Sequence, residues 1–198
     1  MTQASARTSK LAALFSVEPG EGTQTLLMLL YAFCCGIVCT FFYTAAYALF
    51  LAEFDAAMLP YVYIGSGVVA AIGGFIYTTF EKRISIPRLM LGTMVVLILS
   101  NLVFFLALRL TGAKWVVFAA IIWYDVLFTF VEVGFWGLAT NLYNVRQGKR
   151  LFGLIGSGEQ LAGTIAGMST PLVVSLIGTT NLLLVALVAF VFCLGVVW

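Results

Sequence analysis

Six apolar stretches, each long enough to cross a membrane as a helix, constrain this chain more than any other feature. They cover Thr23–Leu51, Leu59–Phe80, Leu89–Leu108, Trp115–Thr140, Leu151–Leu176 and Leu182–Trp198. A hydrocarbon core about 30 Å thick is spanned by about 20 apolar residues in a helix. Hydrophobic residues make up 63% of the chain and charged residues only 9%, which is unlike a soluble domain. The sequence predicts an all-α membrane protein that folds as a bundle of six transmembrane helices.

The basic residues predict which way the helices run. If the N-terminus is cytoplasmic, eight of the ten Lys and Arg residues lie on the cytoplasmic side. These eight are Arg7, Lys10, Lys82, Arg83, Arg88, Arg146, Lys149 and Arg150, and the other two are Arg109 and Lys114. Cytoplasmic loops of membrane proteins carry an excess of such residues. We therefore expect an integral protein of a bacterial inner membrane with both termini in the cytoplasm.

The chain divides into a cytoplasmic N-terminal segment, residues 1–22, and one transmembrane domain, residues 23–198. Within the first segment, Lys10–Val17 fits a short interfacial helix as well as a disordered tail. The sixth stretch runs to Trp198 without a polar flank, whereas membrane helices usually finish with interfacial or basic anchors. We expect one half of a longer transporter built from parallel repeats; the alternative is a complete small protein that dimerises.

Three carboxylates interrupt the apolar stretches: Asp125, Glu132 and Glu159. A charge at the bilayer centre costs about 2.5–3.5 kcal/mol on insertion scales, and such groups usually face a bundle interior or a water-filled path. Asp125 and Glu132 are seven residues apart, which places them on one helical face about 10 Å apart along the axis. With Trp136 one turn beyond Glu132, this face is typical of a substrate or coupling-ion path. The alternative is that the acids only form hydrogen bonds between helices.

No Lys or Arg lies in the interior of any of the six stretches. Three states of the acids remain open on the sequence. They are protonated because burial disfavours their charge, they are solvated in a cavity, or they pair with cations from a second half of the protein. The first state would make them proton-coupling groups, and the third would make them ion-pair gates.

Polar and small residues form stripes on two further stretches. In the fifth, Gly153, Ser157, Gln160, Thr164, Gly167, Pro171 and Ser175 recur every three or four residues. In the first, the stripe is Gly36, Thr40, Tyr43 and Tyr47. Asn101 in the third stretch is uncharged but needs a hydrogen-bond partner. We expect the cavity for a substrate or coupling ion to be formed by Asp125, Glu132, Glu159, Gln160, Asn101, Trp136 and Tyr43.

Two loops on the predicted cytoplasmic side carry charge. Glu81, Lys82 and Arg83 follow the second stretch, and Lys149 and Arg150 precede the fifth. Charges in such loops form ion pairs that depend on conformation, or they only anchor the topology. We expect these five residues to serve as a cytoplasmic gate or anchor.

Metal and soluble-type catalytic sites are not expected. The chain has no histidine, which is the commonest metal ligand and general base. Its cysteines Cys34, Cys35, Cys39 and Cys193 all lie in apolar stretches without a paired-ligand spacing, so they are expected to be packing residues. We expect no enzyme activity, no metal, no cofactor and no nucleic-acid partner.

The junction of the fourth and fifth stretches carries a family resemblance. Phe135–Asn141 (FWGLATN), a short polar loop and Lys149–Gly158 (KRLFGLIGSG) resemble the nucleotide transporter family. These are the ATP/ADP antiporters of plastids and intracellular bacteria, which are relatives of the major facilitators. The match covers about residues 124–160. It implies the N-terminal six-helix half of a major facilitator fold, an alternating-access mechanism and a nucleotide as cargo.

The chain also departs from this family. Its members carry a basic residue for phosphate charge in the first stretch, where Tyr43–Ala46 has none, and Glu159 and Gln160 replace apolar or small residues. Phosphates removed from water need cationic or N–H partners. We expect secondary transport of a small solute, with the lipid bilayer and a second six-helix half or a second copy as partners. The alternative is a membrane anchor or sensor that regulates attached cytoplasmic domains without transporting anything.

Overall fold

The computed structural model describes residues 17, 18 and 20–197. The expected interfacial helix at Lys10–Val17, and the basic residues Arg7 and Lys10, lie outside the described residues except for Val17. The described chain is helical apart from its connections. Its elements are α2 (Gly22–Glu53), the short 3₁₀ turn η1 (Ala56–Met58), α3 (Leu59–Glu81), α4 (Ile86–Thr111), α5 (Lys114–Leu142), α6 (Val145–Ile177) and α7 (Leu182–Val197).

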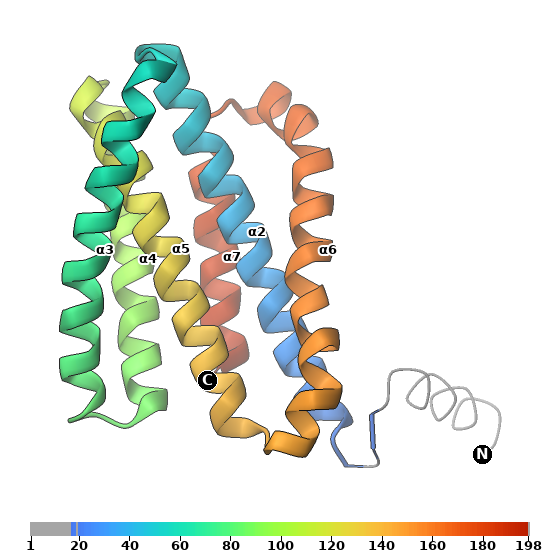
Figure 1. Ribbon diagram of the computed structural model, residues 1–198. Coiled ribbons are helices and arrows are strands. Elements are labelled where there is room, and N and C mark those ends of the chain that lie inside the picture. The colour runs from blue at the N-terminus through green and yellow to red at the C-terminus, as the bar shows by residue number, and fades with distance from the viewer. Residues whose placement is uncertain (1–16, 19, 198) are drawn as a thin grey trace.

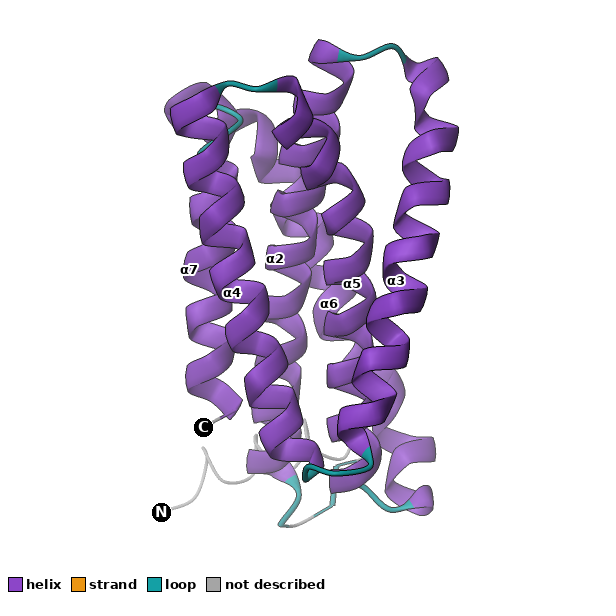
Figure 2. Cartoon of the chain, turned by 90° about the vertical axis from the view of Figure 1, so that its left-hand side faces the viewer, coloured by secondary structure: helices purple, strands orange, loops and turns teal. Residues whose placement is uncertain are grey.

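The six long helices run alternately up and down in one antiparallel bundle (Figures 1 and 2). We call the end that holds the start of α2, the α3–α4 loop and the α5–α6 loop the lower end, and the opposite end the upper end. The α7 helix finishes at the lower end (Figure 1). The first and last described helices therefore have their outer ends on the same side of the bundle.

Five of these helices, α2 to α6, are long and apolar enough to cross a membrane. The sixth, α7, is a shorter apolar helix. Large apolar side chains such as Phe75, Met168 and Leu172 lie exposed on the outside of the bundle. Such a surface is stable when lipid covers it, because lipid tails are as apolar as the side chains. The predicted all-α architecture is confirmed for the described residues, and the long apolar helices are consistent with a membrane protein.

The helix ends follow local chemistry. Asn144 caps α6: its side chain accepts a hydrogen bond from the Gln147 N–H, and the Gln147 side chain accepts one from the Asn144 N–H. Such a capping box satisfies backbone donors at the first turn of a helix. At the upper end, α4 terminates at Gly112, whose φ of 56° suits glycine. These two signals produce the short connections that set neighbouring helices antiparallel.

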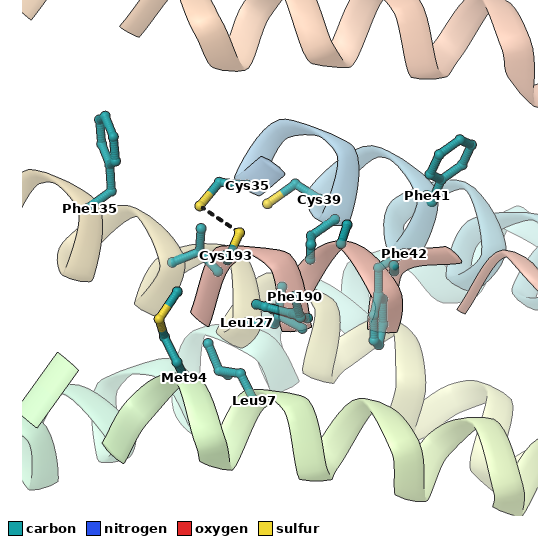
Figure 3. Packing of buried hydrophobic residues seen from close by; sticks show 14 of the residues in the cluster. Cys35, Cys39, Phe41, Phe42, Met94, Leu97, Leu127, Phe135, Phe190 and Cys193 are labelled. Carbon is teal, nitrogen blue, oxygen red and sulfur yellow. Dashed lines mark hydrogen bonds between the residues drawn. The ribbon is translucent and has the colours of Figure 1, made fainter. Parts of the chain in front are cut away.

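The core is centred on α2, which packs against α5, α6 and α7. Phe42, Phe50, Phe135 and Phe190 are among its largest fully buried side chains. Three of the four cysteines are buried here, with the Cys35 and Cys193 Sγ atoms 4.0 Å apart (Figure 3). All four cysteines are free thiols.

The contact between α2 and α6 is unusually close, and we call it the α2–α6 seam (Gly36, Ala32, Gly158 and Ala162). A Cβ atom added to Gly36 would lie 2.5 Å from the Glu159 backbone oxygen and 2.8 Å from the Ala162 Cβ atom. A Cβ atom added to Gly158 would lie 2.7 Å from the Leu29 backbone oxygen. Small residues let helix backbones approach this closely in membranes. The seam therefore fixes α6 on α2.

Candidate functional site

A cavity of about 270 Å³ opens between α2, α5 and α6. It is lined by Gly36, Cys39, Thr40 and Tyr43 from α2, Tyr124 and Phe128 from α5, and Glu159, Gln160 and Gly163 from α6. In α5 the residue midway between Lys114 and Leu142 is Phe128, and in α6 the midpoint of Val145–Ile177 is residue 161. The cavity therefore lies near the middle of the helices, far from either end. We call it the central pocket.

The two faces of α6 explain why Glu159 reaches the central pocket. Leu151, Ile155, Gly158, Ala162 and Ala166 are buried on one side of the helix. The predicted polar stripe lies mostly on the other side. Of its members, Gly153, Gln160, Thr164, Gly167, Pro171 and Ser175 are exposed and Ser157 is half-buried. Because Gly158 and Ala162 hold α6 against α2, Glu159 and Gln160 are brought to the pocket wall.

Aromatic rings form the opposite wall of the central pocket. The Tyr43 ring lies 5.3 Å from the Tyr124 ring, and Tyr47 lies 4.3 Å from Tyr43, measured between ring centroids. Phe128, one turn along α5 from Tyr124, lies 6.3 Å from it. The predicted stripe on the first apolar stretch thus contributes Gly36, Thr40 and Tyr43 to the pocket.

Glu132 lies beside this pocket and is held by a tryptophan. The Trp136 Nε1–H donates a 2.9 Å hydrogen bond to Glu132 Oε2. The Trp136 ring lies over Gly156 of α6, where an added Cβ atom would be 3.7 Å away, and meets the Phe152 ring edge-on at 5.5 Å. The Glu132 and Glu159 carboxylates lie close enough to interact. Trp136 thus orients one member of a carboxylate pair that spans α5 and α6.

Asp125 lies nearer the upper end than Glu132, because α5 runs downward (Figure 1). Asp125 is half-buried and directly follows Tyr124 in α5. It does not belong to the lining of the central pocket. Asp125 therefore lies outside the lining, whereas Glu159 lies at the pocket itself.

Asn101 is the predicted cavity residue that lies apart from the others. It is fully buried in α4, and neither its Oδ1 nor its Nδ2 atom has a hydrogen-bond partner among the described residues. Leaving a buried amide unpaired costs about 1–3 kcal/mol. Its neighbour Ser100 accepts a 2.9 Å hydrogen bond from Trp123 of α5. Asn101 thus lies on α4, buried within the bundle, and outside the central pocket.

Charged residues at the lower end form a compact network. Arg150 forms ion pairs with Glu18 and with Glu21, the latter 2.5 Å from Nη2 to Oε2. Gln147 Nε2 donates a 2.8 Å hydrogen bond to Glu21 Oε1. The hydrogen bond from Gln147, supported by the Arg150 guanidinium, lowers the pKa of the Glu21 carboxyl below its ordinary value. This network ties the start of α6 to the segment before α2.

The other predicted gate or anchor residues have different surroundings. Glu81, Lys82, Arg83 and Lys149 are exposed. Within residues 17, 18 and 20–197, none of the four forms an ion pair, whereas Arg150 forms two. The structure therefore joins Arg150 to acidic partners and leaves the remaining four at the surface of the lower end.

Sequence reasoning missed two groups of residues. Glu18 and Glu21 were not expected to pair with Arg150, because they are more than 120 residues away from it. Phe128 and Cys39 also line the pocket, although Cys39 is predicted only as a packing residue and Phe128 stands in an apolar stretch. The signal for Phe128 was available, since it lies one turn after Tyr124 on the same face of a helix.

Metal chemistry has no candidate site in the described part of the chain, where no group of three or more Cys, Asp or Glu residues could hold an ion. No protein-family model matches the chain, and neither a curated protein nor a solved structure matches it. The resemblance to nucleotide transporters therefore stays a prediction.

Proposed function

We propose that this protein is a secondary membrane transporter that moves a small solute by alternating access. The observation that carries the proposal is the central pocket, where Glu159 and Gln160 line a cavity at the middle of two membrane-crossing helices. Ionisable groups at this depth are costly and usually mark substrate or ion pathways. Glu132 and Asp125 stand beside the same cavity and would serve the solute or a coupling ion.

The exposed face of α6 carries polar residues, which supports contact of this face with water or with protein. Gln160 and Thr164 are exposed near the middle of this helix. A polar side chain facing lipid at that depth would lose its hydrogen bonds to water. We propose that a second six-helix half or a second copy covers this face and completes a major-facilitator-like transporter, with the cavity between the two parts.

The orientation belongs to the same proposal. The lower end carries Lys82, Arg83, Arg88, Arg146, Lys149 and Arg150, and the upper end carries Arg109 and Lys114. We place the lower end in the cytoplasm of a bacterial cell, with Arg150 as an anchor between α6 and the N-terminal segment. Single cysteines introduced at Asp55 and Gln147 test this: an impermeant thiol reagent should label only position 55 from outside intact cells. Labelling of position 147 alone would reverse the orientation.

Transport is tested with the full-length protein in liposomes. Uptake of labelled ADP and of labelled choline is followed with and without an imposed proton gradient. ADP represents the cargo that the resemblance suggests, and choline represents a cationic solute. Uptake of either above that of empty liposomes supports the proposal. Uptake of neither, under any gradient, would favour the alternative of a membrane anchor or sensor domain.

The intramembrane acids provide the matched variants for this assay. Asp125→Asn and Glu159→Gln should abolish coupled uptake while leaving the amount of folded protein unchanged. Glu53→Gln removes an exposed acid that lies outside both the pocket and the predicted gate, in a surface ion pair with Lys114, so it should transport like the unmodified protein. Unchanged uptake in both Asp125→Asn and Glu159→Gln would remove these carboxylates from the mechanism.

A further inference from the structure

The central pocket offers the face of an aromatic ring system to whatever enters it. Tyr43, Tyr124 and Phe128 line it, with successive ring centroids 5.3 and 6.3 Å apart, and Tyr47 extends the cluster behind Tyr43. Tyr43 is 44% exposed, so its ring is open to a ligand. Aromatic faces carry negative electrostatic potential and attract cations within about 6 Å of the ring centroid.

The charges around the same pocket have one sign. The Glu159 carboxylate lines the cavity, Glu132 is close enough to interact with Glu159, and Asp125 follows the lining residue Tyr124 in α5. Within residues 17, 18 and 20–197, the basic residues lie in loops or in the first or last two turns of the helices, away from these acids. A cation entering the pocket would meet a carboxylate on one wall and ring faces on the other.

An anion would find no comparable partners on these walls. Phosphates and carboxylates are bound by Arg, Lys or free backbone N–H groups. Free N–H groups belong to the first turn of a helix, and the pocket residues lie near the middle of α2, α5 and α6, where the N–H groups are bonded within the helix. The pocket walls therefore select against the phosphates of a nucleotide.

The size and lining of the pocket favour an organic cation over a metal ion. Its volume, about 270 Å³, lies just below the range of about 300–1,000 Å³ in which drug-sized ligands bind. Hard metal cations are bound mainly by several carboxylate and carbonyl oxygens, whereas Glu159 is the single carboxylate among the residues that line this cavity. Recognition of quaternary ammonium groups by aromatic side chains follows the opposite pattern, with few oxygens and several rings.

We propose that the central pocket binds a small organic ammonium ion, with Tyr43 and Tyr124 against the alkyl groups and Glu159 as the counter-charge. This inference rests on the proposed transport function only for its cargo role, because binding itself can be measured without transport. Glu132, held by Trp136, adds negative potential from the lower side of the pocket.

Binding is tested on the purified full-length protein by calorimetric titration with tetramethylammonium chloride. Sodium chloride and ADP are titrated in parallel. We expect saturable binding of tetramethylammonium, no competition by sodium at equal concentration and no binding of ADP to the same site. Equal competition by sodium would make the pocket an inorganic cation site and overturn the inference. Binding of ADP that tetramethylammonium displaces would also overturn it, because the same site would then accept phosphates.

Two pairs of variants separate the contributions of charge and ring. Glu159→Gln and Tyr43→Leu should each weaken tetramethylammonium binding about tenfold or more, as loss of a buried counter-charge or a cation–π contact requires. Tyr43→Phe keeps the ring, and Tyr61→Leu removes an exposed tyrosine of α3 that is 62% accessible, so both should stay within about threefold. Folding of each variant is checked by its Tm. Binding that Glu159→Gln and Tyr43→Leu leave unchanged would contradict the proposed site.

The titration tests the ammonium site, and the uptake assay tests transport, so either proposal can be rejected without the other. Binding of tetramethylammonium without uptake of choline or ADP would keep the ammonium site and reject transport. Uptake of ADP without any ammonium binding would keep transport and reject the ammonium site.

Discussion

The two faces of α6 have opposite surroundings. On one face Gly158 and Ala162 meet α2 so closely that an added methyl group would collide with backbone or side-chain atoms. On the other face Gln160, Thr164 and Gly167 are exposed, and a Cβ atom added to Gly167 would meet nothing within 4 Å. Glu159 lies at the boundary between them. One side of α6 therefore holds the helix against α2, and the other side presents polar groups to the pocket.

The greatest loss of stability is expected from a substitution in the packed face, where α6 meets α2. Gly36→Ala places a methyl group 2.5 Å from the Glu159 backbone oxygen, and a backbone atom cannot move aside cheaply. We expect a loss of stability of up to about 3 kcal/mol, since overpacking of a tight core costs about 1–3 kcal/mol. The measurement is the Tm of the purified protein in detergent. Gly167→Ala is the matched control on the open face and should leave the Tm unchanged; an equal drop in both variants would erase the distinction between the faces.

A smaller loss of stability is expected where Trp136 of α5 meets the exposed face of α6. Trp136→Phe keeps an aromatic ring against Phe152 but removes the N–H that donates to Glu132. Because the carboxylate is half-buried, the loss should be about 1 kcal/mol, at the lower end of the cost of an unpaired buried acceptor. Thermal unfolding measures it. Trp115→Phe, at a site 84% exposed, should show no change, and a tolerant Trp136→Phe would mean that Glu132 is not positioned by this bond.

The interactions of Glu21 with the start of α6 should make the stability of the protein depend on pH. Because the pKa of Glu21 is lowered in the folded state, its contribution to stability is present above its unfolded pKa and disappears as the pH falls through the folded pKa. Glu21→Gln should therefore have a lower Tm than the unmodified protein at pH 7. This Tm difference should shrink as the pH falls through the folded pKa of Glu21. Glu81→Gln, at an exposed acid, should match the unmodified protein at every pH; a Glu21→Gln difference independent of pH would contradict the lowered pKa.

The smallest effect is expected on the open face itself. Gln160→Ala removes an exposed side chain that forms no hydrogen bond within the described residues. We expect a change in stability within about 0.5 kcal/mol, the usual range for surface substitutions. If the variant is instead strongly destabilised, this face is part of the packed core, and the division between the two sides of α6 fails. The unfolding midpoint in detergent is again the measurement.

The helices were predictable from the sequence because their signals are local. The first five apolar stretches each fall within a helix, and the sixth corresponds over its described residues to α7. The predicted bounds of the fourth, Trp115–Thr140, lie within two residues of those of α5. The same holds for the stripe Gly36, Thr40 and Tyr43, since residues three and four apart share a helical face whatever surrounds them.

The site was less predictable because it depends on which helices become neighbours. The periodicity of the fifth stretch marked one stripe of polar and small residues, but the close contact with α2 is made by Gly158 and Ala162, which lie outside that stripe. Asn101 was also predicted to lie with the acids, although it is buried on α4, outside the central pocket. Periodicity identifies the polar positions of a helix, but only the rotation and neighbours of that helix decide which of them meet.

The close approach of α2 and α6 also has a consequence for size selection. These two helices cannot separate without opening the contacts of Gly36 and Gly158, so one wall of the cavity has a fixed shape. The opposite wall belongs to α5, which makes few direct contacts with α6. A ligand too large for the cavity must therefore displace Tyr124 and Phe128. The distance that α5 can move away from α6 sets the upper limit on ligand size.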